Sequence, residues 1–227
     1  MTLQEMHERL VAWASDEARK EWLLAARQAY FEGFGEPHEE DKSFESRMNC
    51  LLDWVLYDFR PNGVDTMLEL FLRDRSQALT TDELAEIREL TRNLHGLFEV
   101  RRMQPGQIRL RDVFTRNDHD VTERRTLAGL AKGDLLEARL LPHDGHLYFS
   151  GAFLYHPQEV RKAILAEVKR LRKAGKKGGS LDVKAFLATL SRMAFKLERY
   201  RNVKIESIYD FAGSSATLTP RPGGGGQ

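Results

Sequence analysis

The chain has 227 residues, of which 41% are hydrophobic and 30% charged, which is enough to bury a core in one or two domains. No run approaches the ~18 apolar residues of a membrane span, and the first residues, MTLQEMHERL, lack the apolar region of a signal peptide. The formal net charge of +1 excludes a uniformly polycationic molecule.

Helical spacing of apolar residues dominates the first 96 residues. Thr80 and Glu83 form a capping-box pattern that opens the last of these helices, and Gly96 stands where a glycine closes a helix. Asn62-Gly63 after Pro61 favours a turn. The predicted helical regions are 3–34 (two helices), 43–58, 65–72 and 80–96.

At Leu97 the spacing of apolar residues changes from that of a helix to that of a strand. A three-residue loop, 104–106, pairs Val100 with Leu110 and Phe98 with Asp112, so that the apolar residues share one face. A third strand is expected around 120–124, and a fourth, over 135–141, follows the turn residues 132–134. The pattern predicts an antiparallel five-stranded small barrel, of the SH3 or OB kind.

The most chemistry-like stretch is LLPHDGHLYFSGAF, from Leu140 to Phe153. A two-residue turn at Asp144-Gly145 sets Leu140 opposite Phe149 on an apolar inner face, and leaves both His143 and His146 on the outer face beside the turn. The same register places Glu137, Arg139 and Ser150 on the outer face. Two histidines are too few for a closed zinc site, which needs about four ligands. The interpretation is therefore a polar turn without a metal, and His119, His143 and His146 remain weak metal candidates.

After Phe153 the helical period returns. Val160, Ile164, Val168 and Leu171 fall within an arc of about 80°, and Ser180 caps a final long helix. The segment 202–211 is compatible with a further strand or docking segment, and the residues from Gly213 on resemble a disordered tail. The predicted fold class is α+β, with a helical domain at 1–96, the barrel at 97–155, two helices in a C-terminal helical segment at 156–211, and a disordered tail at 212–227.

The stretches DWVLYDF (53–59), GVDTMLE (63–69), GLFEV (96–100), IRLRD (108–112) and GDLLEARL (133–140) resemble an uncharacterised bacterial module that combines helices with a small barrel. Such modules occur in proteins that carry SEC-C-type cysteine motifs. The resemblance covers roughly residues 44–155 and implies no established activity. Because this chain lacks the cysteine motif, the resemblance implies no zinc.

Motifs for phosphate-binding loops, dinucleotides, zinc proteases, paired cysteines and serine hydrolases are all absent from the sequence. Asp53 and Asp58 lie about 140° apart on a helix, so they are not expected to share a face. Cys50 is the one cysteine, which excludes an internal disulfide and favours a reducing, cytoplasmic setting. These features favour a protein that is not an enzyme and needs no cofactor.

Three functions remain open. The first is a binding or adaptor protein that docks a protein partner, with Tyr148 and Tyr155 on the outer barrel face. The second is an enzyme of unfamiliar type at the barrel loops, where the candidates are His119, Asp120, His143 and His146.

The third is sequence-independent nucleic-acid binding by the basic helix 157–177. Residues 161–177 hold eight basic residues against one acidic residue, whereas residues 32–45 hold six acidic residues against one lysine. A solvated helix face, or docking of this helix on the acidic loop 32–45, would account for the same charges. The cationic candidates are Arg161, Lys162, Lys169, Arg170, Arg172, Lys173, Lys176 and Lys177. None of the three functions implies a membrane partner, and the oligomeric state stays open.

Overall fold

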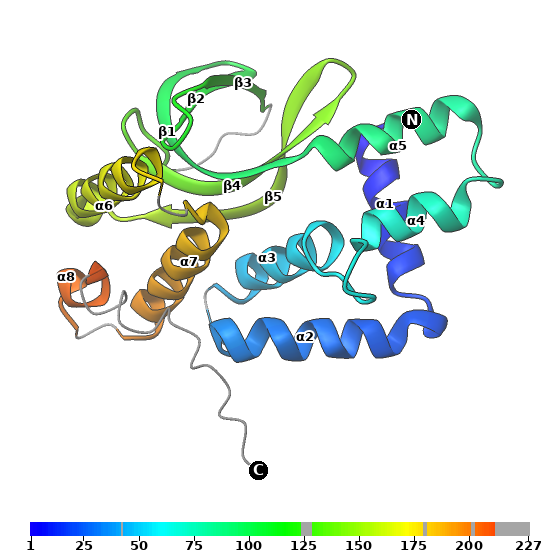
Figure 1. Ribbon diagram of the computed structural model, residues 1–227, viewed down its shortest axis with the longest axis horizontal. Coiled ribbons are helices and arrows are strands. Elements are labelled where there is room, and N and C mark those ends of the chain that lie inside the picture. Colours follow the sequence, from blue (N-terminus) through cyan, green and yellow to red (C-terminus); the bar gives the residue numbers. More distant parts are fainter. Residues whose placement is uncertain (42, 124–128, 179–180, 201–202, 212–227) are drawn as a thin grey trace, which may run out of the picture. The chain divides into compact units, whose positions relative to one another are not determined.

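The computed structural model describes residues 1–41, 43–123, 129–178, 181–200 and 203–211. The chain forms two compact units, Met1–Tyr155 and His156–Gln227. The first contains both the predicted helical domain and the predicted barrel, and the second contains the C-terminal helices (Figure 1). The fold class is α+β, as predicted, and the predicted tail at 212–227 lies outside the described residues.

The helical part of the first unit is held in place by well-capped helices. Thr2, Thr66 and Thr80 each close a capping box with the glutamate three residues later, which satisfies backbone donors at the helix start. Fully buried side chains of these helices, among them Met6, Leu10, Leu56, Met67 and Ile87, form one core. The helices are α1 (Leu3–Ala14), α2 (Lys20–Phe34), α3 (Phe44–Tyr57), α4 (Met67–Arg75) and α5 (Thr81–Glu89), with 3-10 turns at Glu17–Arg19 and Leu90–Arg92.

The strands close into a barrel in the order β1-β2-β3-β5-β4. Its pairs are antiparallel, as predicted, except that β3 and β5 run parallel. Among the residues that the structure describes, these two strands pair at Val121 with Leu147 and at Thr122 with Tyr148. The prediction of a purely antiparallel barrel is therefore wrong at this one pair. The strands are β1 (Leu94–Gln104), β2 (Gln107–Asp112), β3 (Asp118–Thr122), β4 (Leu135–His143) and β5 (His146–His156).

The β1–β2 hairpin has the predicted pairing but a different turn. Phe98 pairs with Asp112 and Val100 with Leu110, as predicted, yet the strands continue until Gln104 faces Gln107. The loop therefore has two residues, and Gly106 takes a φ of 79° in it. A bulge between Val100 and Arg102 supplies the one-residue shift that was assigned to the loop.

Gly96 does not close a helix. The chain leaves α5 through the 3-10 turn directly into β1 (Figure 1), where Gly96 pairs with Ala138. A Cβ at this position would lie 3.0 Å from the ring of Phe98, which covers the glycine on the same strand. The glycine thus makes room for an aromatic ring, a role that sequence alone does not separate from a helix cap.

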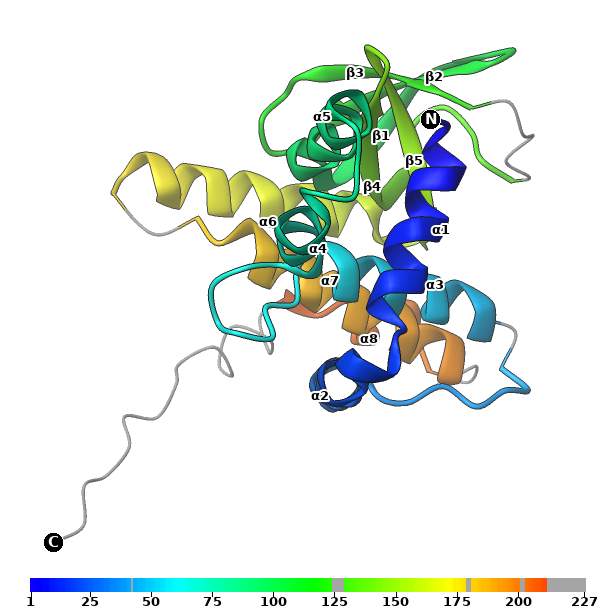
Figure 2. The ribbon, with the colours of Figure 1, turned by 90° about the vertical axis from the view of Figure 1, so that its right-hand side faces the viewer.

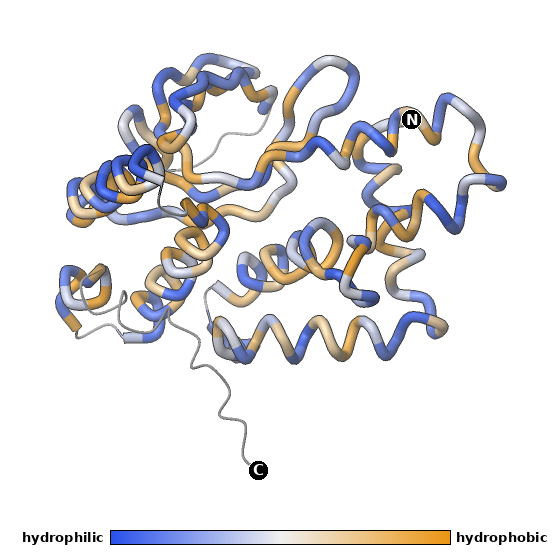
Figure 3. The backbone as a smooth tube through the Cα atoms, in the orientation of Figure 1, coloured by the Kyte–Doolittle hydropathy of each residue, from blue (hydrophilic) through white to orange (hydrophobic). Residues whose placement is uncertain are grey.

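The β4–β5 hairpin turns at Asp144-Gly145, as predicted. Both residues have positive φ, 48° and 71°, which is the backbone of a tight two-residue hairpin turn. Leu136, Ala138, Leu140 and Phe149 lie in the barrel core, which confirms the predicted inner face. The hydropathy tube shows the tip of this hairpin as hydrophilic (Figure 3).

The outer face of β4 is covered, a point that the sequence pattern left open. Glu137 and Arg139 are buried with 5% and 4% of their surface exposed. Leu141, on the same strand, belongs to the core of the helical part. The helices of the first unit therefore pack against this barrel face.

Replacing Gly145 by alanine is expected to lower the free energy of unfolding by about 1–2 kcal/mol, because an L side chain is strained at positive φ. Chemical denaturation would measure the loss. The matched control is Gly33→Ala near the end of α2, where nothing lies within 4 Å of the added carbon; it should stabilise by up to about 1 kcal/mol. Equal effects of the two substitutions would contradict the assigned turn.

In the described residues of the second unit there are three helices, one more than predicted. They are α6 (Gln158–Lys176), α7 (Val183–Arg199) and the short α8 (Ile205–Ile208), which occupies the segment expected to be a strand or docking segment. Tyr209 joins this end to the start of the unit, since its hydroxyl lies 3.0 Å from His156 Nδ1. Across the described ranges, no helix combines the length and the apolar character that crossing a membrane requires.

Candidate binding site beside the barrel hairpin

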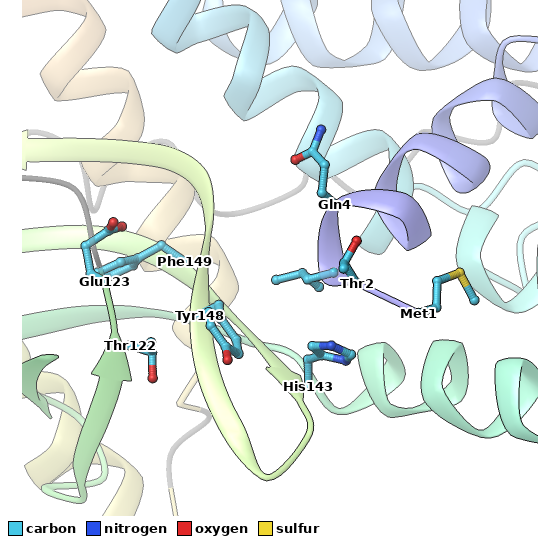
Figure 4. Close-up of a pocket in the computed structure, with 9 residues that line it drawn as sticks. Met1, Thr2, Gln4, Thr122, Glu123, His143, Tyr148 and Phe149 are labelled. Atoms are coloured by element: carbon cyan, nitrogen blue, oxygen red, sulfur yellow. The ribbon is translucent and has the colours of Figure 1, made fainter. Parts of the chain in front are cut away.

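A cavity of about 500 Å³ lies where the β4–β5 hairpin meets the start of α1 and the end of β3 (Figure 4). We call it the hairpin cavity. Its size falls within the range of ligand pockets. The side chains that line it come from three separate parts of the first unit: Met1, Thr2, Leu3 and Gln4; Thr122 and Glu123; His143, Tyr148 and Phe149.

Backbone pairing fixes the floor of the hairpin cavity. Thr122 and Tyr148 face each other across the parallel β3–β5 pair. On the opposite side, the Thr2 hydroxyl accepts a hydrogen bond from the Glu5 amide at 3.2 Å as the N-cap of α1. Figure 2 shows this end of α1, marked N, close to β5. The residues that line the hairpin cavity are therefore held in place by strands and by a helix start.

His143 is shared between the hairpin cavity and a second cavity of about 400 Å³. Its Nδ1 atom is buried and has no hydrogen-bond partner within the described part of the chain. The second cavity is also lined by Ala85, Glu86, Glu89 and Asp144. A ligand that fills either cavity would contact the His143 ring.

The two cavities are acidic. Their lining includes Glu123, Glu86, Glu89 and Asp144, and in the described ranges it includes no lysine or arginine. The α-amino group of Met1 lies 2.9 Å from Glu86 and offsets part of this charge. Residues 1–155 carry 28 acidic against 20 basic residues, a formal balance of −8. The local and the unit-wide charge both favour a cationic ligand.

The structure places the three candidate metal histidines in different surroundings. The ring of His119 packs edge-on against Phe98, at 5.9 Å between centroids, and His146 Nδ1 lies 2.7 Å from the carbonyl oxygen of Asp144. His143 faces the cavities. In the part of the chain that the structure describes, no three His, Cys, Asp or Glu side chains are arranged to hold a metal ion.

Asp120, the remaining candidate of the enzyme hypothesis, is an ion-pair partner. Arg109 donates to both of its carboxylate oxygens, at 2.8 and 2.7 Å, and this hydrogen bonding lowers the pKa of Asp120. Asp118 makes the equivalent pair with Arg111. These two ion pairs lie on the paired strands β2 and β3. Within the described residues they do not form one candidate catalytic site with His119 and His143.

A buried ionic cluster centred on Arg139 was missed by the sequence analysis. Its guanidinium donates to Asp58 and to Asn93, its Nε lies 3.4 Å from Asp53 Oδ2, and the ring of Tyr57 lies 5.0 Å away. Asp53 and Asp58 thus meet at one cation, although they were expected on different faces of a helix. Asp58 lies at the C-cap, beyond the last helical turn, and its backbone no longer follows the helical spacing.

The Arg139 cluster joins α3 to the barrel. Ser150 on β5 donates to Asp53 at 2.5 Å, so both β4 and β5 contact the same helix. Burial raises the pKa of Asp53 by more than Arg139 and Ser150 lower it. Charged residues in the otherwise apolar stretches DWVLYD and LLEARLL are the sequence signal that could have revealed this pairing.

The cationic candidates of the basic helix all lie on or just after α6, but in different environments. Lys162, Lys169, Lys173, Lys176 and Lys177 are exposed, whereas Arg161 and Arg172 are half-buried. Arg170 donates to Glu167 at 2.8 and 2.6 Å. The structure therefore separates an exposed lysine set from arginines that are paired or partly covered.

The fold defines an α+β protein in which a helical region and a small closed barrel form one acidic unit, followed by a helical unit with a basic helix. A model of a family of unknown function, DUF7986, matches residues 15–207. The chain belongs to this family. No curated protein and no solved structure shows significant similarity to it. The resemblance to modules of SEC-C-motif proteins stays a prediction.

Proposed function

We propose that this chain is a non-enzymatic binding protein whose first unit docks a basic segment of a protein partner. The observation that carries the proposal is the pair of adjoining cavities at His143, with acidic side chains around them. A lysine or arginine side chain entering there would meet carboxylates, and apolar neighbours would meet Leu3 and Phe149. A cytoplasmic setting, as favoured by the single cysteine, accompanies this proposal.

Tyr148 is the residue best suited to anchor such a segment. It lines the hairpin cavity, and its ring lies 6.2 Å from that of His143. Tyrosines in partly enclosed sites carry a large share of binding energy because they bury much area and lose little conformational freedom. Tyr155, the other predicted contact, is 46% exposed, stacks on Phe153 and does not line the hairpin cavity.

The test uses a photo-cross-linking amino acid in place of Tyr148 in the full chain, in cells. The matched control carries it at Val64, which is 68% exposed in a turn of the same unit. A protein should be captured at position 148 and not at 64. With that protein purified, Tyr148→Ala should weaken binding by about 30-fold, the size of an interface hot spot, and Val64→Ala should leave it unchanged.

Added salt should also weaken the interaction, because it screens attraction between the acidic cavities and a basic segment. Capture only of a second copy of this chain at position 148 would contradict docking of a partner. Equal capture at 148 and 64, or binding that Tyr148→Ala leaves intact, would show that the hairpin cavity is not the docking site.

A further inference from the structure

The near-neutral chain combines two units of opposite charge. Residues 156–227 carry 15 basic and 6 acidic residues, a formal balance of +9, against −8 for residues 1–155. The net charge of +1 therefore hides a strongly cationic unit. Its ligand is expected to differ from that of the acidic first unit.

The exposed lysines of α6 lie in one row. At 100° per residue, Lys162, Lys169, Lys173 and Lys176 fall within an arc of about 60° and span about 21 Å along the helix axis. All four are exposed. We call this row the lysine stripe. Figure 3 shows the corresponding alternation of hydrophilic and hydrophobic residues along α6.

The opposite side of α6 is apolar and buried. Val160, Ile164 and Val168 have at most 2% of their surface exposed and point about 160–240° away from the lysine stripe. A helix that binds a lipid surface inserts its apolar face into the bilayer, and this face is already covered. The stripe therefore presents charge without an accompanying apolar surface.

We infer that the lysine stripe binds the phosphate backbone of a double-stranded nucleic acid, independently of sequence. A straight row of ammonium groups complements a regular line of phosphates, which place one charge per ~3.4 Å of duplex axis along each strand. Lysines act as point charges and do not supply the planar, two-pronged contacts with which arginine reads guanine. Of the two arginines that flank the stripe, Arg172 is half-buried and Arg170 is held by Glu167.

The prediction concerns the salt dependence of binding. Neutralising about four phosphates gives a slope near −3.6 in log affinity against log salt, so binding should weaken ~150-fold between about 50 and 200 mM salt. Fluorescence anisotropy with labelled duplexes of two unrelated sequences, as DNA and as RNA, measures this on the full chain. Both sequences should bind equally well.

Replacing the four stripe lysines by alanine should bring the slope close to zero while circular dichroism stays unchanged, because alanine favours the helix. Replacing them by arginine should preserve the slope. A charge-matched control removes four exposed cations of α7, namely Lys184, Arg192, Lys196 and Arg199. That control should keep most of the slope.

Several outcomes would overturn the inference: no binding to duplex DNA or RNA at about 50 mM salt, an equal loss in the α7 control, equally tight binding of polyglutamate, or binding only to vesicles containing phosphatidylserine. None of these results depends on the hairpin cavity. Failure here would leave the proposed docking of a partner untouched, and the Tyr148→Ala variant should bind duplexes normally.

Discussion

Replacing Arg139 by methionine is expected to lower the free energy of unfolding by about 3–5 kcal/mol, as when one partner of a buried ion pair is removed. Methionine fills much of the volume, so the loss arises from charge. Asp53 and Asp58 would remain at the junction of α3 and the barrel without their cation. Denaturation in urea, followed by circular dichroism, would measure the difference.

Arg109→Met is the matched control, since Arg109 also binds a carboxylate through two nitrogens but lies at the surface, with 48% of its side chain exposed. The exposed pair should contribute less than about 1 kcal/mol. A loss at Arg139 no larger than the loss at Arg109 would mean that the Arg139 cluster does not hold the helical part on the barrel.

The deficit of Arg139→Met is expected to depend on pH. Since burial raises the pKa of Asp53, the folded state holds this proton more tightly than the unfolded state. The contribution of such a group to stability is greatest at low pH and is lost as the pH rises through its folded pKa. Removing Arg139 raises that pKa further, so the deficit should be smaller near pH 4.5 than at about pH 7.

Replacing Leu140 by aspartate is expected to unfold the barrel. Leu140 is fully buried among the apolar side chains of the barrel core, where a carboxylate finds no partner. The cost of several kcal/mol approaches the whole stability of a typical domain, about 5–15 kcal/mol. Met103→Asp on β1, where 39% of the residue is exposed, is the control and should remain folded. A cooperative, native-like melt of Leu140→Asp would contradict the inner face.

Local patterns predicted those parts of the barrel that depend on neighbouring residues. The alternation around Val100 and Leu110 determined their pairing, and Asp144-Gly145 determined the second hairpin. The bulge near Arg101 was assigned to the loop, because a bulge and a longer loop shift the register by the same one residue.

Contacts between distant segments could not be predicted in the same way. The parallel β3–β5 pair has no turn of its own to mark it. The hairpin cavity depends on α1 reaching this pair, so of its lining residues only His143 and Tyr148 had been singled out. The partners of Arg139 come from α3 and from the residues before β1, 81 and 46 positions away. Charged residues in apolar stretches indicate that each needs a partner, but they do not indicate which residue that partner is.

The parallel pair of β3 and β5 makes the barrel uneven in its resistance to opening. In the described part of the chain two residue pairs join β3 to β5, whereas β1 is paired with β2 and β4 along most of its length. Backbone amides that bond across the β3–β5 pair are therefore expected to exchange with solvent through small local openings, whereas those in the middle of β1 are expected to exchange only when the whole unit unfolds. Since Thr122 and Tyr148 line the hairpin cavity, opening of this pair would widen the cavity while the other strands stay paired.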